Sequence, residues 1–127
     1  MELEGGEGSE WLQIYAHYQN NAPPRKFIGN FIASKEYAVY IMTNKHNRVL
    51  YTGMTNNLHR RVYEHKTGIG GKFVKRYNVT KLVYFEVGGE TKEALFRERQ
   101  IKAGSRQKKI DLINEFNPEW RDLYEEI

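Results

Sequence analysis

Two short runs of β-branched and aromatic residues, separated by a polar segment, place the tightest constraint on the fold of this chain. Residues 37–42 read YAVYIM and residues 49–52 read VLYT, with the polar stretch TNKHNR between them. Runs of this composition favour β-strands, and a short polar connection joins two such strands as a hairpin. The sequence therefore predicts that a β-hairpin begins the folded part of the protein.

The rest of the chain alternates between helical and extended patterns. The remaining predicted elements are a helix from Asn56 or Asn57 to about Lys66, a glycine-rich loop at 68–71, a strand at 81–87, a helix capped by Thr91 and ending at about Ala103, and a helix over about residues 106–116. The order β-β-α-β-α-α predicts a small α/β (α+β) domain, with a three-stranded, mainly antiparallel sheet flanked by helices.

Residues 1–36 differ in composition from the remainder of the chain. The first eight residues are rich in Glu and Gly, and aromatic residues then recur at helical spacing, at Trp11, Tyr15 and Tyr18. We expect an N-terminal extension over residues 1–36, partly disordered and with a short helix, followed by one folded domain over residues 37–127.

Composition narrows the class of protein. No apolar run approaches the roughly 18 residues that span a bilayer, and the acidic, glycine-rich N-terminus is not typical of a secretory signal. The absence of cysteine excludes disulfides and thiolate metal sites, and it favours a cytoplasmic, intracellular setting. The net charge of +4 favours a polyanionic partner, and we expect DNA in the nucleoid and no membrane.

Glu98 occupies an unusual position in its predicted helix. On a helix that advances about 100° per residue, Glu98 falls at the middle of the apolar stripe formed by Ala94, Leu95 and Ile101. A carboxylate in that position requires either an ion pair with an arginine or a bound metal ion. Both interpretations remain open from helical geometry alone.

Two further pairs of residues can each be interpreted either as structural or as part of a chemical site. Arg61 and His65 are four residues apart and share a helix face beside Leu58, where they form either a solvated edge or a clamp for phosphate. Tyr40 and Tyr51 lie on the two strands of the predicted hairpin, where they either pack or bind water or phosphate through their hydroxyls.

Basic residues cluster in the last two predicted helices, either as a solvated face or as a surface that tracks a nucleic-acid backbone. The cluster consists of Arg97, Arg99, Lys102, Arg106, Lys108 and Lys109. Among the nearby acids, Glu86 and Asp111 are expected on the surface, and Glu64 is expected off the inner face of its helix.

These positions together resemble the signatures of the GIY-YIG endonuclease family. The Gly-Ile-Tyr strand of the family reads AVY at residues 38–40, and the Tyr-Ile-Gly strand reads YTG at residues 51–53. The family places an arginine ten residues after the second tyrosine and a histidine four residues later, as Arg61 and His65 lie here. The similarity covers roughly residues 36–123, and the C-terminal stretch is similar to the small stand-alone, YhbQ-like branch of the family.

The resemblance implies a metal-dependent endonuclease that hydrolyses DNA phosphodiester bonds, either with low sequence specificity or with selection for DNA structure. It assigns catalytic roles to Tyr40, Tyr51, Arg61, His65 and Glu98. Within this set Glu98 would bind one Mg²⁺ or Mn²⁺ ion, Tyr40 would act as base or orient water, and Arg61 would neutralise the phosphate. Tyr51 and His65 would position water or pass protons.

The same resemblance leaves several alternatives open. Lys102, Arg106 and Lys109 are expected to bind the nucleic-acid backbone, and either Asn114 or Asn117 would supply an additional asparagine of the site. The substrate could be branched or single-stranded DNA, with RNA as the alternative, in repair, recombination, defence or homing. Rival functions are a nucleic-acid-binding module without catalysis and a protein-interaction domain.

Overall fold

The computed structural model describes residues 37–88 and 90–127 and confirms the predicted antiparallel sheet. The strands are β1 (Ala38–Thr43), β2 (Leu50–Thr55) and β3 (Lys81–Val87), and they lie in the order β2-β1-β3 with β1 antiparallel to both neighbours. The extension predicted over residues 1–36, with its short helix, lies outside the described residues.

Strand pairing assigns each side chain of the sheet to one of two faces, because neighbours in register point the same way and successive residues alternate. Tyr40 pairs with Gly53 and Phe85 on one face, which we call the α3 face. Val39 pairs with Glu86 on the other face, which we call the α5 face. All six residues of β1 are buried, as expected for a central strand covered on both sides.

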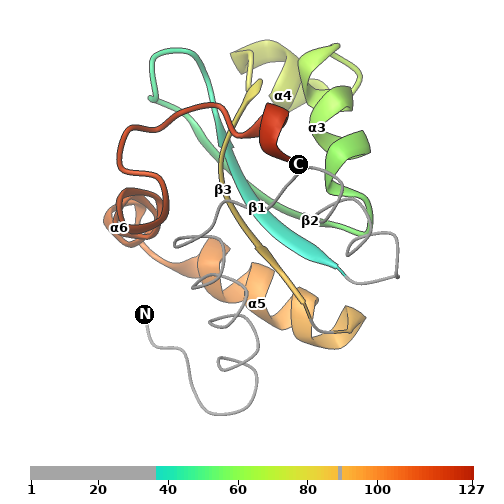
Figure 1. Cartoon of the computed structure of the whole chain (residues 1–127), viewed down its shortest axis with the longest axis vertical. Coiled ribbons are helices and arrows are strands. Elements are labelled where there is room, and N and C mark those ends of the chain that lie inside the picture. The colour runs from blue at the N-terminus through green and yellow to red at the C-terminus, as the bar shows by residue number, and fades with distance from the viewer. Residues whose placement is uncertain (1–36, 89) are drawn as a thin grey trace.

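Helices cover both faces of the sheet. They are α3 (Leu58–Lys66), α4 (Lys72–Tyr77), α5 (Thr91–Ala103), α6 (Arg106–Phe116) and the short 3-10 helix η1 (Tyr124–Glu126). Figure 1 shows α3 and α4 on one side of the strands and α5 and α6 on the other. No helix in the described part of the chain is both long and apolar enough to cross a membrane.

Local capping explains where three of these helices begin. The side chain of Asn57 accepts a hydrogen bond from the backbone N–H of Arg60, so Asn57 rather than Asn56 caps α3. Ser105 caps α6 in the same way. The predicted cap of α5 at Thr91 is wrong, because Glu90 occupies that position and forms a reciprocal capping box with Glu93.

Helix α4 is absent from the predicted order and is the main difference in secondary structure. The helix has six residues, of which only Val74 is buried, so the sequence carries no amphipathic repeat that would indicate it. It lies between Gly71, with φ of 119°, and Asn78, with φ of 55°. Both residues adopt the left-handed conformations that glycine and asparagine tolerate, and they bound the helix at its two ends.

The C-terminal segment folds back against the sheet. The backbone N–H of Leu123 donates to the carbonyl of Leu82 on β3 at 2.8 Å, and both Leu123 and Ile127 are buried. Asn117 is buried as well, and its side-chain amide donates to the carbonyls of Val83 and Arg121. The last residues of the chain therefore pack against β3, an edge strand of the sheet.

Candidate active site

Tyr40 and His65 meet at the centre of the α3 face. Tyr40 projects from β1, and His65 comes from the last turn of α3, on the same helix side as Leu58 and Val62. The Tyr40 hydroxyl lies 3.3 Å from Nε2 of His65, and their rings meet edge to face with centroids 5.7 Å apart. Both side chains are buried, so this pair forms the inner part of the site.

The partners of His65 determine which of its ring nitrogens carries the proton. Nδ1 lies 3.2 Å from the carbonyl oxygen of Val79, and that oxygen can only accept a hydrogen bond. Nδ1 therefore carries the proton in the neutral ring, and Nε2 accepts from the Tyr40 hydroxyl. Burial lowers the pKa of His65 to about 4, against the opposing effect of the Val79 carbonyl, so the ring is neutral near pH 7.

Tyr51 forms the outer part of the aromatic cluster. It projects from β2 onto the same face, and its ring centroid lies 5.2 Å from that of His65 and 6.3 Å from that of Tyr40. Tyr51 is partly exposed, whereas Tyr40 and His65 are each only 1% exposed. A substrate outside the cluster would therefore meet Tyr51 before Tyr40.

Arg61 supplies the positive charge beside the two tyrosines. Its guanidinium donates to Oε1 of Glu64 at 2.8 Å and to the carbonyl of Gly70 at 3.2 Å. The hydrogen bond to Glu64 raises the pKa of Arg61, and the hydroxyls of Tyr40 and Tyr51 add to this effect. Glu64 was expected off the inner face, but the structure makes it the direct partner of Arg61.

Gly53, the last residue of the YTG motif, makes room for the Tyr40 ring. A Cβ atom at this position would lie 2.6 Å from the Tyr40 hydroxyl oxygen and 2.8 Å from its Cζ. Real Cβ atoms do not approach other atoms this closely, and the buried Tyr40 ring has little room to move. Gly53 is therefore a positioning residue of the cluster, and its motif was the sequence signal for it.

The protonation of Tyr40 bears on its chemical role. Burial raises the pKa of the Tyr40 phenol to about 12, and the hydrogen bond and charge of Arg61 only partly offset this effect. Near pH 7 the phenol therefore keeps its proton. It can orient a water molecule through its lone pairs while it donates to His65.

Glu98 lies apart from the other four predicted catalytic residues. Its helix packs against β1 and β2, and the adjacent Arg97 binds Glu86 on the α5 face of the sheet. The Glu98 side chain is 12% exposed, and its Oε2 lies 2.9 Å from Nζ of Lys102. The structure thus brings together Tyr40, Tyr51, Arg61 and His65 and places Glu98 on the opposite face.

The ion pair buried beneath α5 is Glu86–Arg97, which the sequence analysis did not predict. Arg97 is 1% and Glu86 is 3% exposed, and two nitrogens of the guanidinium donate to the two carboxylate oxygens at 2.8 and 2.6 Å. The Tyr84 hydroxyl donates to the same carboxylate. The expectation of Glu86 as a surface acid is wrong, and Arg97 does not belong to an exposed basic cluster.

Three lysine and arginine side chains predicted to bind a nucleic-acid backbone make contacts within the protein. Lys102 pairs with Glu98, Arg106 donates to the carbonyl of Arg48 at 2.7 Å, and Lys109 donates to the carbonyl of Gly104 at 2.5 Å. Burial lowers the pKa of Lys109. Their contact with nucleic acid remains a prediction, and it would require Lys102 or Arg106 to exchange partners.

Both candidate asparagines hold the C-terminal segment in place. Asn114 accepts a hydrogen bond from the indole N–H of Trp120 at 2.6 Å. Asn117 binds the backbone of Arg121 and of Val83, as described above. Their contacts support a structural role for each and do not choose between them as a site residue.

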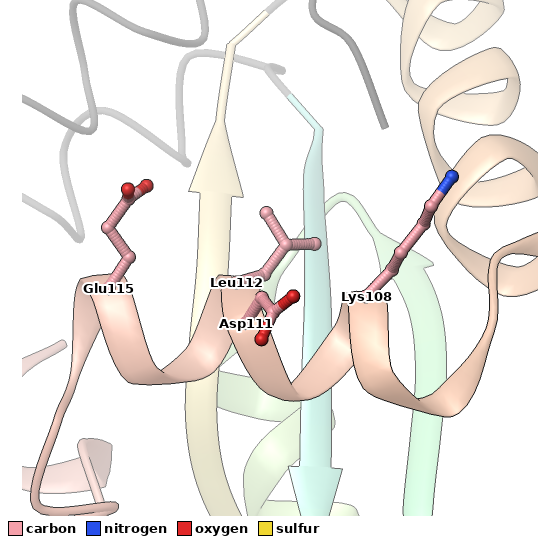
Figure 2. Close-up of a pocket in the computed structure, with 4 residues that line it drawn as sticks. All are labelled: Lys108, Asp111, Leu112 and Glu115. Atoms are coloured by element: carbon pink, nitrogen blue, oxygen red, sulfur yellow. The ribbon is translucent and has the colours of Figure 1, made fainter.

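A shallow pocket lies on α6, away from the tyrosine cluster. It is lined by four side chains spread over about two turns of the helix, at Lys108, Asp111, Leu112 and Glu115. Figure 2 shows Lys108, Leu112 and Glu115 projecting from the same side of α6. None of these residues belongs to the predicted catalytic set.

The donor groups available for a metal ion are few. The described residues contain no group of three or more His, Cys, Asp or Glu side chains that could enclose an ion. Mg²⁺ commonly binds one or two carboxylates and keeps several water ligands. Glu98 fits that pattern, because its partner Lys102 has a side chain that is 60% exposed and can turn into solvent.

Comparisons with known proteins agree with the residue pattern. The family model described as the GIY-YIG catalytic domain matches residues 36–111. A UPF0213 protein of Clostridium perfringens is 43% identical over 76 residues, which cover 60% of this chain and 81% of the relative. A UPF0213 protein of Staphylococcus haemolyticus is also 43% identical, over 82 residues that cover 65% of this chain and 98% of the relative.

Among solved structures, the solution NMR structure of a UPF0213 protein from Bacillus halodurans is 30% identical to this chain. The match covers 72% of this chain and 92% of that protein, with a TM-score of 0.43.

Proposed function

This chain belongs to the GIY-YIG catalytic domain family, among the UPF0213 proteins, and on that premise we propose that it is a metal-dependent endonuclease that cuts DNA. The family supports a nuclease-type activity in general. The observation that carries the more specific proposal is the convergence of Tyr40, Tyr51 and His65 with the Arg61 guanidinium on one face of the sheet.

Arg61 is suited to bind the phosphate that is cut. A guanidinium can give two parallel hydrogen bonds to non-bridging phosphate oxygens, and it keeps its charge throughout the reaction. In the described structure Glu64 occupies one side of this group at 2.8 Å. Substrate binding would replace or share that contact, which would place the phosphate beside the exposed edge of Tyr51.

Tyr40 and His65 then act as one hydrogen-bonded unit. The neutral His65 ring holds the Tyr40 hydroxyl proton on its own side, so the lone pairs of the phenol oxygen point toward the attacking water. Because the pKa of Tyr40 is about 12, we assign this residue to orienting the water near neutral pH. A proton lost by that water can pass through the phenol to Nε2 of His65.

We assign the metal ion, Mg²⁺ or Mn²⁺, to Glu98. A bound divalent ion supplies positive charge that stabilises the oxygen leaving phosphorus. Glu98 and the tyrosine cluster lie on opposite faces, and β2 is the edge strand that carries Tyr51 and contacts α5. We therefore place the scissile phosphate at the β2 edge, where the two faces meet.

The test is cleavage of supercoiled plasmid and of labelled branched, single-stranded and duplex oligonucleotides, in Mg²⁺, Mn²⁺ or EDTA. Arg61→Ala and Glu98→Ala should each reduce metal-dependent cutting by on the order of 10²-fold or more, because each removes a charge that stabilises the transition state. Far-UV circular dichroism should show that both variants fold.

Two exposed residues of matching charge serve as controls. Lys92→Ala and Glu119→Ala should cut as the wild type does, because both positions are exposed and neither belongs to a predicted site. Equal activity of Arg61→Ala and wild type would refute the assigned site. Loss of metal-dependent cutting in Arg61→Ala but not in Glu98→Ala would show that the metal ion is bound by other residues. Binding without cutting in any metal would favour a non-catalytic DNA-binding module.

A further inference from the structure

Helix α4 exposes two aromatic side chains on one face. Phe73 is 46% and Tyr77 is 39% exposed, and the two are four residues apart on the helix. Their ring centroids lie 4.8 Å apart at an interplanar angle of 50°. Exposed apolar groups that gather in one place, with charged residues around them, are typical of an interaction surface.

These rings continue the aromatic cluster of the active site outward. The ring of Phe73 lies 6.1 Å from that of Tyr51, which itself lies 5.2 Å from His65. The series His65, Tyr51, Phe73 and Tyr77 therefore leads from the buried centre of the site to solvent. A ligand lying on α4 would be adjacent to the proposed phosphate position.

Backbone hydrogen bonds hold α4 in a defined place relative to the site. The carbonyl of Val74 accepts from the N–H of Val79, whose own carbonyl accepts from His65. The carbonyl of Gly70, just before the helix, accepts from Arg61. The two predicted catalytic residues of α3 are thus tied to both ends of the segment that presents the rings.

The charge around this surface is strongly positive. Residues 58–77 contain six Lys and Arg side chains and one acid, Glu64. Three of the six, Lys72, Lys75 and Arg76, are on α4, and no ion pair in the described part of the chain involves that helix. The guanidinium of Arg76 lies 5.3 Å from the centre of the Tyr77 ring.

We propose that Phe73 and Tyr77 form a stacking platform for unpaired nucleobases, next to the site of cutting, with the α4 cations holding the strand's phosphates. This inference rests on the proposed nuclease function for its partner. Aromatic rings beside a basic groove bind single strands because every base has a flat face, while duplex bases already stack on each other. The preferred substrate would be a single strand, or a branched DNA with an unpaired nucleotide at the cut.

The test is binding in EDTA, where metal-dependent cutting does not occur. Fluorescence anisotropy would compare a labelled 12-nucleotide single strand with a blunt duplex hairpin, for wild type and the double variant Phe73→Ala/Tyr77→Ala. Affinity for the single strand should fall by on the order of tenfold for each ring that stacks a base, and affinity for the duplex should be unchanged. 2-Aminopurine placed in the strand should be quenched by the wild type and not by the double variant.

Matched variants separate the rings from other effects. Phe73→Trp/Tyr77→Trp should bind the single strand as well as the wild type does, because the flat aromatic surface is retained. Phe96→Ala removes a ring that is 54% exposed on α5 and should leave both affinities unchanged. Lys72→Gln/Lys75→Gln should weaken binding of single strand and duplex alike, because phosphate contacts do not require unpaired bases.

Each outcome either supports the platform or overturns it. Ring-dependent binding of the single strand, in a protein that cuts in no metal, would support the platform and refute the nuclease. Cutting that needs Arg61 and is indifferent to both rings would support the nuclease and refute the platform. Equal loss for single strand and duplex would also refute it. The platform would also be refuted if single-strand binding were unchanged and the double variant changed the sedimentation coefficient of the protein. That result would show that the two rings form a protein interface.

Discussion

Among single residues, His65 shows how neighbours determine chemical function. The sequence alone is compatible with a His65 that donates to a phosphate or that shuttles a proton. In the structure, Nδ1 is engaged by the Val79 carbonyl and Nε2 by the Tyr40 hydroxyl, and the ring is buried. A buried ring with both nitrogens occupied is placed to accept a proton from Tyr40 and not to contact a phosphate directly.

The low pKa of His65 predicts how the stability of the protein depends on pH. The unfolded chain gains a proton on this ring below about pH 6.5, whereas the folded protein keeps it neutral down to a pKa of about 4. Unfolding therefore takes up a proton in this window. The stability contributed by neutral His65 is complete above pH 6.5 and is lost as the pH falls toward 4, by up to about 1.4 kcal/mol per pH unit.

Urea unfolding followed by circular dichroism between pH 4 and pH 8 measures this effect. His65→Asn removes the titrating group, so the difference in unfolding free energy between wild type and variant should shrink as the pH falls below 6.5. Carboxylates that titrate in the same range are present in both proteins and cancel in the difference. A difference that is constant over the whole range would contradict the assignment.

At the scale of elements, the Glu86–Arg97 pair joins α5 to β3 through the interior. Two hydrogen bonds connect the guanidinium to the carboxylate, and the Tyr84 hydroxyl donates to that carboxylate as well. The pair also determines which side of α5 faces the sheet, because Arg97 must point inward to reach Glu86. Glu98, one position further along, is rotated by about 100° as a result.

Removing one member of this pair should be strongly destabilising. Glu86→Leu leaves the buried Arg97 charge without the carboxylate that neutralises it, so we expect a loss of about 3–5 kcal/mol in the free energy of unfolding. Glu86→Leu/Arg97→Met removes both charges and should recover most of that loss. Glu126→Gln, at a pair whose Arg121 side chain is 55% exposed, should change stability by less than about 1 kcal/mol.

These values would come from urea unfolding at pH 7 of all three variants and the wild type. A Glu86→Leu variant as stable as the wild type would show that the pair is not needed to join α5 to the sheet.

For the whole molecule, charge is the property that matches the proposed partner. The chain carries a net charge of +4, and the segment of residues 58–77, which includes α3 and α4, carries six Lys and Arg side chains and one acid. Binding to a nucleic acid releases counterions from the phosphates, so its affinity depends steeply on salt.

We predict that the affinity for DNA falls linearly with salt on a double logarithmic plot between 50 and 200 mM. The slope should decrease by about one for each phosphate-binding residue that is neutralised. Anisotropy titrations of wild type, Lys72→Gln and Lys102→Gln would measure the slopes. A reduced slope for Lys72→Gln alone would place the DNA on the α3 face, and a slope near zero for wild type would rule out a polyanionic partner.

Much of this architecture follows from local patterns in the sequence. The three strands, helix α3 (Leu58–Lys66) and the last two helices depend on periodicity and capping within each segment. The spacing of Arg61 and His65 on one turn of α3 depends on helix geometry in the same way. Short-range rules cover these features because the residues involved are only a few positions apart.

The tertiary structure alone decided the features that depend on distant partners. A helical wheel gives the angle between Arg97 and Glu98 but not which of them faces the interior, and Glu86, eleven residues earlier, settled that question. Helix α4 has one buried residue and forms where the carbonyls of Gly70 and Val79 bind Arg61 and His65. The tautomer of His65 and the burial of Tyr40 likewise follow from contacts between elements. Such contacts join residues that are far apart in the sequence, so the pattern of one segment cannot predict them.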